Sequence, residues 1–378
     1  MNSQKILFVV TEDWYFCSHR LPLAVEAKNN GYDVVVATRV SDQRETIEQN
    51  GLRLINLTCM KRSSINPFRE LAAFIEILQI IRRERPDLLH LVAMKPAIYG
   101  ALSSKLTGFS KRVNALGGLG FVFSSKKLLA RILRPMLLSL FRFIFNDPQS
   151  RLILQNEDDL ALMTEKAGVD RCNIRLIFGA GVDLQQYPAT KLPVGQPVVV
   201  LASRLLWDKG IGEFVAAATS LREQGVKARF VLVGDSDLEN PGSVPREQLK
   251  AWHDSGVIEW WGYQKNMPDI LSQASVVCLP TYYGEGVPKI LIEGMACARP
   301  IVTTDMPGCR TLVREGRNGL LVPPKSTTDL SNALAKLINS PQLCLEMGQA
   351  GRRIAEEDYS QTQVIGETLS VYRELKSK

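Results

Sequence analysis

Residues 280–296, PTYYGEGVPKILIEGMA, contain the features from which the fold of this chain can be inferred. The apolar run 276–279 in front of them predicts a short buried strand. Gly284 and Gly286 predict a turn, and the apolar residues after position 289 recur at helical spacing. This order of strand, glycine-rich turn and helix is typical of sites where backbone N–H groups at a helix start bind phosphate.

Two glutamates flank the predicted helix start. Glu285, before the helix, and Glu293, within it, are eight residues apart, about 2.2 turns at 3.6 residues per turn, so the two carboxylates can share one face near the helix start. Carboxylates would repel phosphate, but they accept hydrogen bonds from hydroxyl groups. A site for phosphate and several hydroxyls describes a sugar nucleotide.

The bulk composition is that of a globular protein with more than one core. The chain has 378 residues, of which 45% are hydrophobic and 22% charged, and this size favours two domains. No apolar run reaches the roughly 18 residues of a membrane span, and we expect no signal peptide at the start. The seven cysteines are scattered without a C-x-x-C spacing, which favours reduced thiols in a cytosolic protein and argues against zinc.

Positive charge is concentrated in the first half. Residues 1–183 contain 25 Lys and Arg against 18 Asp and Glu, whereas residues 184–378 contain 21 of each. The 59 residues between Asp87 and Asp147 contain no acidic residue and nine basic ones. This distribution predicts an anionic partner or surface for the first half. Nucleic acid is not expected as that partner, because the sequence contains no nucleic-acid recognition motif.

Strands and helices alternate through both halves, which predicts an α/β fold with two doubly wound parallel sheets. Residues 11–20 are interpreted as a turn, and 126–145 as a helix with a kink or break at Pro135. The last helix is long enough to cross back onto the first domain. The expected divisions are an acceptor-binding domain (1–183), a linker (184–196), a nucleotide-sugar-binding domain (197–358) and the C-terminal helix (359–378).

Two cations follow the predicted strand 198–202. Arg204 and Lys209 lie in the sequence ASRLLWDKG, at the carboxyl end of the strand, where doubly wound sheets bind ligands. We interpret them as a clamp for the phosphates of a diphosphate; the alternative is a solvated charged loop. Asp235 and Asp237 form a D-x-D pattern, which we interpret as an ordinary strand exit because two acids alone bind a metal poorly.

Further candidates lie at predicted strand ends in the first half. His19 and Arg20 follow the first strand and either face a ligand or cap a helix. Lys95 suits phosphate binding, or else a plain surface position. The cluster 117–120, GGLG, lacks the G-x-G-x-x-G spacing, so it predicts close backbone approach to a ligand or partner without a cofactor.

These motifs together resemble those of family 4 retaining glycosyltransferases, which have the GT-B architecture of two facing Rossmann-like domains. The resemblance covers essentially the whole chain. It implies that Arg204 and Lys209 bind the donor diphosphate near Gly286 and Val287, that Glu293 binds the ribose and that Glu285 binds the donor sugar. It also implies a nucleotide sugar, expected to be UDP-linked, as the donor, and catalysis with no cofactor and no metal. The residues that carry the resemblance are Glu285-x7-Glu293, Ser203-Arg204, Lys209-Gly210, the run 179–183 (GAGVD), Pro307-Gly308 and Gly316-x-Asn318-Gly319.

Within that family the chain is similar to bacterial enzymes that extend polyprenyl-diphosphate-linked sugars. The similarity lies in 18–24 (SHRLPLA), 95–100 (KPAIYG), Asn114 with 118–120, and 286–289 (GVPK). It implies a lipid-linked saccharide acceptor and an N-acetylhexosamine, such as N-acetylgalactosamine, as the transferred sugar. Many members have a histidine where this chain has Gly117, so the contact to the donor sugar from the first domain is not identified. The acceptor-binding residues that the resemblance implies are His19, Arg20, Lys95, Asn114 and Gly118.

Residues 126–145, KKLLARILRPMLLSLFRFIF, combine an apolar helical face with basic margins. We expect Lys126, Lys127, Arg131 and Arg134 to bind the anionic inner face of the cytoplasmic membrane peripherally, where a lipid-linked acceptor is met. The alternative is a core helix with a solvated edge. The alternative functions are a non-catalytic sugar-nucleotide-binding protein, or an epimerase or phosphorylase acting on activated sugars.

Overall fold

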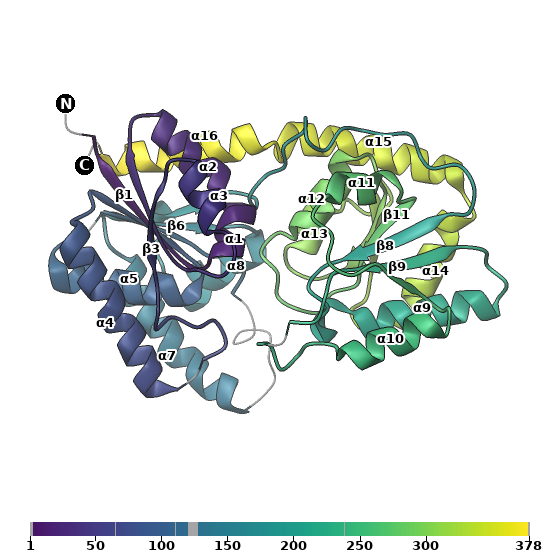
Figure 1. Cartoon of the computed structure of the whole chain (residues 1–378), viewed down its shortest axis with the longest axis horizontal. Coiled ribbons are helices and arrows are strands. Elements are labelled where there is room, and N and C mark those ends of the chain that lie inside the picture. Colours follow the sequence, from purple (N-terminus) through teal and green to yellow (C-terminus); the bar gives the residue numbers. More distant parts are fainter. Residues whose placement is uncertain (1–2, 65, 110, 120–127, 238, 377–378) are drawn as a thin grey trace. The chain divides into compact units, whose positions relative to one another are not determined.

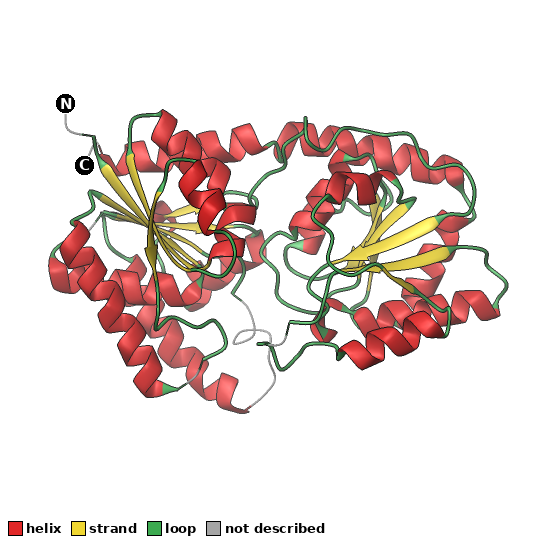
Figure 2. Ribbon diagram, in the orientation of Figure 1, coloured by secondary structure: helices red, strands yellow, loops and turns green. Residues whose placement is uncertain are grey.

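The computed structural model describes residues 3–64, 66–109, 111–119, 128–237 and 239–376, and the side chains of residues 128–132 lie outside that description. The chain divides into two compact units, residues 1–180 with 363–378 and residues 181–362. Each unit is a parallel sheet with helices on both faces (Figures 1 and 2). The predicted α/β fold with two doubly wound parallel sheets is confirmed.

The first unit contains a seven-stranded sheet in the order β3-β2-β1-β4-β5-β6-β7, with parallel pairing between all neighbours. Its strands are β1 (Lys5–Glu12), β2 (Asp33–Arg39), β3 (Arg53–Asn56), β4 (Leu88–Val92), β5 (Arg112–Ala115), β6 (Ser150–Leu154) and β7 (Ile174–Leu176). Its helices are α1 (Asp13–His19), α2 (Leu21–Asn29), α3 (Arg44–Gln49), α4 (Pro67–Glu84), α5 (Met94–Thr107), α7 (Leu128–Phe145), α8 (Glu157–Ala161) and most of α16 (Gln361–Lys376).

One local prediction for this unit is wrong. Residues 11–20 are not a turn, because they contain helix α1. Asp13 at its start is fully buried and accepts hydrogen bonds from the N–H groups of Trp14 (2.7 Å), Ser41 (2.6 Å) and Gln43 (3.0 Å). Partners that far along the chain stabilise the helix start, and no local pattern reveals them. Of the kink or break expected at Pro135, the break does not occur, because α7 continues through this residue as one helix.

The second unit contains a six-stranded sheet in the order β10-β9-β8-β11-β12-β13, again all parallel. Its strands are β8 (Val198–Ala202), β9 (Arg229–Val233), β10 (Glu259–Trp260), β11 (Val276–Leu279), β12 (Ile301–Thr304) and β13 (Gly319–Val322). Its helices are α9 (Ile211–Glu223), α10 (Arg246–Asp254), α11 (Met267–Ser272), α12 (Lys289–Ala296), α13 (Cys309–Leu312), α14 (Thr327–Ile338) and α15 (Pro341–Asp358).

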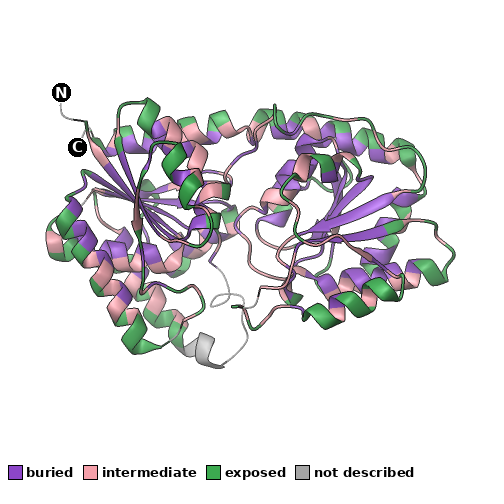
Figure 3. Ribbon diagram, viewed as in Figure 1, coloured by how far each residue is buried: buried purple, intermediate pink, exposed green. Residues whose placement is uncertain are grey.

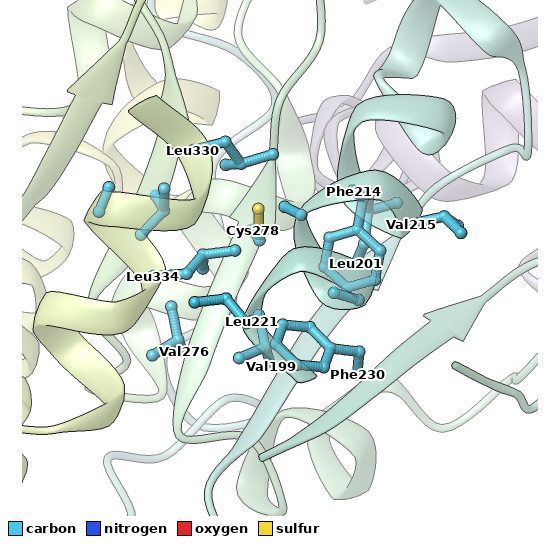
Figure 4. Close-up of a cluster of buried hydrophobic side chains, with 14 of the residues drawn as sticks. Val199, Leu201, Phe214, Val215, Leu221, Phe230, Val276, Cys278, Leu330 and Leu334 are labelled. Carbon is cyan, nitrogen blue, oxygen red and sulfur yellow. The ribbon is translucent and has the colours of Figure 1, made fainter. Parts of the chain in front are cut away.

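The inner strands of both sheets are buried, whereas the edge strands β3, β7 and β10 are only partly buried (Figure 3). In the second unit, side chains from β8, β9 and β11 pack against α9 and α14 in a cluster that includes Val199, Phe214 and Leu334 (Figure 4). All five residues of β8 are buried, which explains why its sequence, VVVLA, is continuously apolar rather than alternating. Helices cover the faces of the sheet, and polar residues lie at its carboxyl edge, where the loops emerge.

Helix α16 packs within the first unit. The hydroxyl of its buried Tyr372 lies 2.6 Å from Nδ1 of His90 in β4, and Glu374 pairs with Arg151 (3.2 Å) and Arg175 (2.6 Å). These contacts attach the end of the chain to the first sheet.

The segment 184–196, which was predicted to be a linker, belongs to the second unit. The buried guanidinium of Arg299 donates hydrogen bonds to the carbonyl oxygens of Thr190 (3.2 Å) and Lys191 (3.1 Å). Part of this polar segment is therefore packed structure.

Candidate active site

The central feature of the second unit is an ion pair between Lys209 and Glu285. Lys209 follows β8 and Glu285 follows β11, and both side chains are mostly buried, with 13% and 14% of their surface exposed. The hydroxyl of Thr281 lies 3.2 Å from the same oxygen of Glu285. A lysine and a carboxylate held together at a sheet edge provide one group for phosphate and one for hydroxyls.

The strand order explains how two residues so far apart in sequence meet. Strands β8 and β11 are parallel neighbours, so their following loops emerge at the same edge. Gly210, which follows Lys209, has φ +78°, and a Cβ atom there would collide with the carbonyl oxygen of Pro280. Glycine therefore permits the loop of Lys209 to lie against the loop of Glu285.

Arg204 lies at the same sheet edge, and its Nη1 atom is 3.1 Å from Oδ2 of Asp237, which follows the neighbouring strand β9. Asp235 pairs instead with Arg246 at the start of α10. The two acids of the D-x-D pattern thus bind two different arginines. Within the described part of the chain, no group of three or more His, Cys, Asp or Glu side chains is arranged to hold a metal ion.

Asp208 is a component of this edge that the sequence did not indicate. It lies in the helical turn Trp207–Lys209, is half-buried, and its Oδ1 atom is buried without a hydrogen-bond partner among the described residues. Burial raises the pKa of Asp208, and the nearby charge of Glu285 raises it further, while Lys209 and Arg204 act in the opposite direction.

Glu293 lies in α12 and is 5% exposed. Its Oε1 atom accepts a hydrogen bond from the hydroxyl of Tyr187 (2.8 Å) and pairs with Lys289 (3.0 Å). Because α12 begins at Lys289, Glu285 precedes the helix and Glu293 lies within it, as the sequence predicted. The two carboxylates contact different groups, Glu285 in the loop and Glu293 in the helix.

Two of the other motif residues that carry the family resemblance have structural roles in this unit. A Cβ atom on Gly308 would collide with the carbonyl oxygen of Gly286, so this glycine permits close packing beneath the loop 284–288. Asn318 accepts a hydrogen bond from the N–H of Arg314 (2.7 Å) and donates one to the carbonyl of Leu312 (3.0 Å). These residues support the loop that carries Glu285.

In the first unit, His19 lies at the end of α1 and stacks on Tyr15, with ring centroids 4.2 Å apart and planes at 9°. A Cβ atom on the exposed Gly117 would lie 3.1 Å from the Tyr15 hydroxyl and 3.9 Å from the side-chain amide of Gln155. Tyr15, Gly117 and Gln155 follow β1, β5 and β6, so the carboxyl edge of the first sheet also carries a polar group of residues. Tyr15 was not indicated by the sequence.

The remaining predicted acceptor residues have mainly internal partners. Arg20 is 5% exposed, and its charge acts on the buried His90 and Tyr372. The ammonium of Lys95 donates to the carbonyls of Lys61 and Ser64 and pairs with Glu70 at 2.9 Å. Asn114 is fully buried in β5, where its amide donates to the Ser150 hydroxyl at 3.0 Å.

Gly118, the last predicted acceptor residue, has φ +94° and is half-buried. The N–H of the next residue, Leu119, donates a hydrogen bond to the carboxylate of Asp159, at the start of α8. Burial raises the pKa of Asp159 to about 6. This buried carboxylate therefore links Leu119, next to Gly118, to the start of α8.

The predicted membrane-binding residues are only partly described. Lys126 and Lys127 lie outside the described residues, and so does the side chain of Arg131; Arg134 is half-buried in α7. Among the described side chains of α7, the large apolar ones that are exposed are Leu133, Met136 and Phe143. None of the helices in the described ranges is long and apolar enough to cross a bilayer.

The fold and the charged edges define the class of protein: a two-unit α/β protein whose doubly wound parallel sheets present polar residues where such sheets bind ligands. Residues 5–156 match the family described as Glycosyl transferase 4-like, and residues 196–340 match the one described as Glycosyl transferases group 1. The chain belongs to the glycosyltransferases with the GT-B fold that carry this pair of domains, as the sequence motifs predicted.

Individual proteins are similar over most of the chain. N,N'-diacetylbacillosaminyl-diphospho-undecaprenol alpha-1,3-N-acetylgalactosaminyltransferase of Campylobacter jejuni is 27% identical over 343 residues, which cover 87% of this chain and 88% of the relative. UDP-Gal:alpha-D-GlcNAc-diphosphoundecaprenol alpha-1,3-galactosyltransferase of Escherichia coli is 22% identical and covers 83% and 82%. The crystal structure of Anabaena Alr3699/HepE in complex with UDP has a TM-score of 0.76 at 19% identity, covering 97% of this chain and all of that one.

Proposed function

We propose that this glycosyltransferase moves a sugar, with retention of configuration, from a UDP-linked donor to a polyprenyl-diphosphate-linked saccharide. The transferred sugar is an N-acetylhexosamine such as N-acetylgalactosamine. The observation that carries the proposal is the juxtaposition of Lys209 and Glu285, with Arg204 in the same loop as Lys209, at the carboxyl edge of the second sheet. The names of both relatives specify diphospho-undecaprenol saccharides, and one of them names a UDP-linked donor, which supports the same chemistry here.

Different side chains bind different parts of the donor. Lys209 and Arg204 bind the diphosphate and stabilise the negative charge that develops on it as the glycosidic bond breaks. Glu285 accepts hydrogen bonds from the sugar hydroxyls, and Glu293 accepts them from the ribose. The backbone N–H groups near Gly286 and Val287, ahead of α12, add further donors for phosphate oxygens.

In this proposal the acceptor hydroxyl attacks from the face that the leaving diphosphate vacates. The departing phosphate accepts the proton of that hydroxyl, so configuration is retained without a covalent intermediate on the enzyme. Arg204 and Lys209 supply the compensating charge, and the proposed reaction requires no metal. His19, Tyr15 and Gly118, at the carboxyl edge of the first sheet, are the proposed contacts to the acceptor.

The first unit is proposed to attach peripherally to an anionic membrane surface. Helix α4 packs on α5, and α5 on α7. Exposed apolar side chains of these three helices include Phe68, which is 84% exposed, Leu106 and Met136. Exposed arginines lie on the same helices, among them Arg82 and Arg142. Apolar and basic side chains together are the combination that binds an anionic leaflet.

The direct test is a transfer assay with the purified chain. The donor is UDP-N-acetylgalactosamine, the acceptor is undecaprenyl-diphosphate-linked N-acetylhexosamine, and the product is analysed by mass spectrometry and by NMR of the new anomeric centre. We expect an α-linked product, also in excess chelator. A β-linked product would refute retention. Release of UDP without transfer to any lipid-linked saccharide would refute the acceptor class and leave donor binding intact.

A further inference from the structure

We propose that Asp208 takes up a proton when the donor diphosphate binds at the carboxyl edge of the second sheet. The inference rests on the proposed function, because it requires a diphosphate beside Lys209 and Arg204. The carboxylate of Asp208 has no other role in the proposed transfer reaction. Its protonation on binding makes donor affinity depend on pH.

The backbone of Asp208 is held in place from two sides. Its carbonyl oxygen accepts hydrogen bonds from the N–H of Tyr282 (2.9 Å) and from the hydroxyl of Thr281 (3.0 Å). Gly210, two residues later, packs against Pro280. These contacts join the loop after β8 to the loop after β11, so Asp208 cannot leave the site without separating the two loops.

Few neighbouring groups stabilise the negative charge of the Asp208 carboxylate. Its buried Oδ1 atom has no hydrogen-bond partner among the described residues, and burial already favours its protonated form. The cations nearest to it are engaged elsewhere, because Lys209 pairs with Glu285 and Arg204 pairs with Asp237. The ionised form of Asp208 is therefore stabilised mainly by the through-space charge of two cations that also pair with other carboxylates, and to a smaller extent by a hydrogen bond from its own backbone N–H.

The charged groups around Asp208 come from several elements. Lys209 and Arg204 lie in its own loop, and Glu285 lies in the loop after β11. Tyr282 is close to Asp208. The charge of Glu213 in α9 also acts on Tyr282, and the Nζ atom of Lys325 lies 4.4 Å from the centroid of the Tyr282 ring. Asp237, which pairs with Arg204, also belongs to this group of charges.

Donor binding changes this balance in one direction. A diphosphate adds two negative charges and draws Lys209 and Arg204 toward itself. Asp208 then faces more negative charge and less positive charge, and both changes favour its protonated form. The proton comes from solvent and forms an O–H bond on the carboxyl group, while the bonds of the donor stay unchanged. The protonated carboxyl can then donate a hydrogen bond to an oxygen of the donor or of Glu285.

The experiment is titration calorimetry of UDP-N-acetylgalactosamine, and separately of UDP, into the full chain, in two buffers that differ in ionisation enthalpy. The sugar nucleotide is the main probe because its diphosphate has no group that titrates near neutral pH. The variants are Asp208→Asn and, as a matched control for loss of one negative charge, Asp235→Asn, whose carboxylate pairs with Arg246. Circular dichroism verifies that each variant is folded.

We expect the wild type and Asp235→Asn to take up a proton on binding, and their affinity to fall by up to about tenfold per pH unit as the pH rises. Asp208→Asn should take up none, its affinity should be independent of pH, and at alkaline pH it should bind more tightly than the wild type. If Asp208 had only a structural role, Asp208→Asn would bind the donor more weakly than the wild type at every pH. If the wild type binds the donor without taking up a proton, or if Asp208→Asn still takes one up, the inference about Asp208 is wrong. The proposed donor binding is unaffected by either result. Absence of binding by both UDP and UDP-N-acetylgalactosamine overturns the proposed donor together with the inference about Asp208.

Discussion

Lys209 and Glu285 stand 76 residues apart in the chain and form an ion pair at the carboxyl edge of the second sheet. The pair joins the proposed phosphate-binding cation to the proposed sugar-binding carboxylate. Before the donor arrives, each charge offsets part of the cost of keeping the other largely out of water. Donor binding then replaces one set of charged hydrogen bonds by another.

The first prediction separates the two glutamates. Glu285→Ala should lower kcat by about 10²-fold, because contacts to the sugar at the reacting centre act in the transition state. Glu293→Ala should mainly raise the donor KM, because ribose contacts are equal in the ground and transition states. Steady-state kinetics with varied donor concentration measures both effects. Tyr187→Phe removes one hydrogen bond to Glu293 and should raise the donor KM less than Glu293→Ala does. Unchanged kinetics in both alanine variants would rule out these roles.

The second prediction concerns Arg204. Arg204→Ala should cost about 3 kcal/mol of transition-state stabilisation, close to 10²-fold in kcat/KM, because a charged hydrogen bond to the departing diphosphate is lost. Arg246→Ala is the matched control, since Arg246 pairs with the other acid of the D-x-D pattern and should leave turnover unchanged. Both variants are assayed with and without excess chelator. Loss of wild-type activity in chelator, restored by magnesium or manganese, would instead make Asp235 and Asp237 metal ligands.

The third prediction tests the packing of the two loops. Gly210→Ala should lower the free energy of unfolding by more than the roughly 1–2 kcal/mol that a left-handed alanine costs, because its Cβ atom also collides with Pro280. Gly225→Ala, at φ +79° with no atom within 4 Å of the added carbon, should show only the smaller cost. Denaturant unfolding measures both. Gly210→Ala should also lose donor binding. Equal destabilisation of the two variants would mean that the loops can separate easily.

The doubly wound sheets could be predicted because their signals are local. Continuous apolar runs such as 198–202 predict buried parallel strands, and the loops after such strands collect at one edge. This rule alone placed Arg204 and Lys209 near the loop of Glu285. The family motifs added roles, but several motif residues, such as Asn318, are explained by the hydrogen bonds that they make within the fold.

The parts that the sequence did not reveal depend on partners distant in the chain. Helix α1 is stabilised by the bonds of Asp13 to residues 41 and 43. Asp208 became a candidate only through its burial between two loops, and Tyr15 through its approach to Gly117. Asn114 was proposed from a motif, yet it is fully buried within the sheet. Residue type at a strand end does not determine whether the side chain points inward or outward.

The fourth prediction concerns Asp159, which accepts a hydrogen bond from the N–H of Leu119 in the first unit. Its pKa is raised from 3.8 to about 6 by burial, so the folded state binds the proton more tightly than the unfolded state does. The free energy of unfolding should therefore fall as the pH rises from about 4 to about 6, by an amount on the order of 3 kcal/mol, and the contribution should be constant above that range. Asp159→Asn should remove this dependence. Denaturant unfolding at a series of pH values is the measurement, with Asp170→Asn as an exposed control. A pH profile identical to that of the wild type would assign the dependence to another group.

The last prediction tests the proposed membrane attachment by liposome flotation. The full chain should float with vesicles that contain anionic lipid, because basic residues near such a surface contribute about 1 kcal/mol each. Binding should weaken as salt rises, since the Debye length shortens from about 10 Å at 0.1 M to about 3 Å at 1 M.

Two sets of variants separate the charged and apolar contributions to that attachment. Replacing Lys126, Lys127, Arg131 and Arg134 by glutamine should reduce flotation and its dependence on salt. Phe68→Ser, on the exposed face of α4, should reduce flotation without changing the salt dependence, because it removes buried apolar area only. A charge-matched control replaces Lys227, Lys250, Lys265 and Lys336 of the second unit by glutamine, and it should float as the wild type does. Equal flotation with neutral and anionic vesicles would show that charge is not the attraction, and no flotation with either would require another anionic partner for the basic half of the chain.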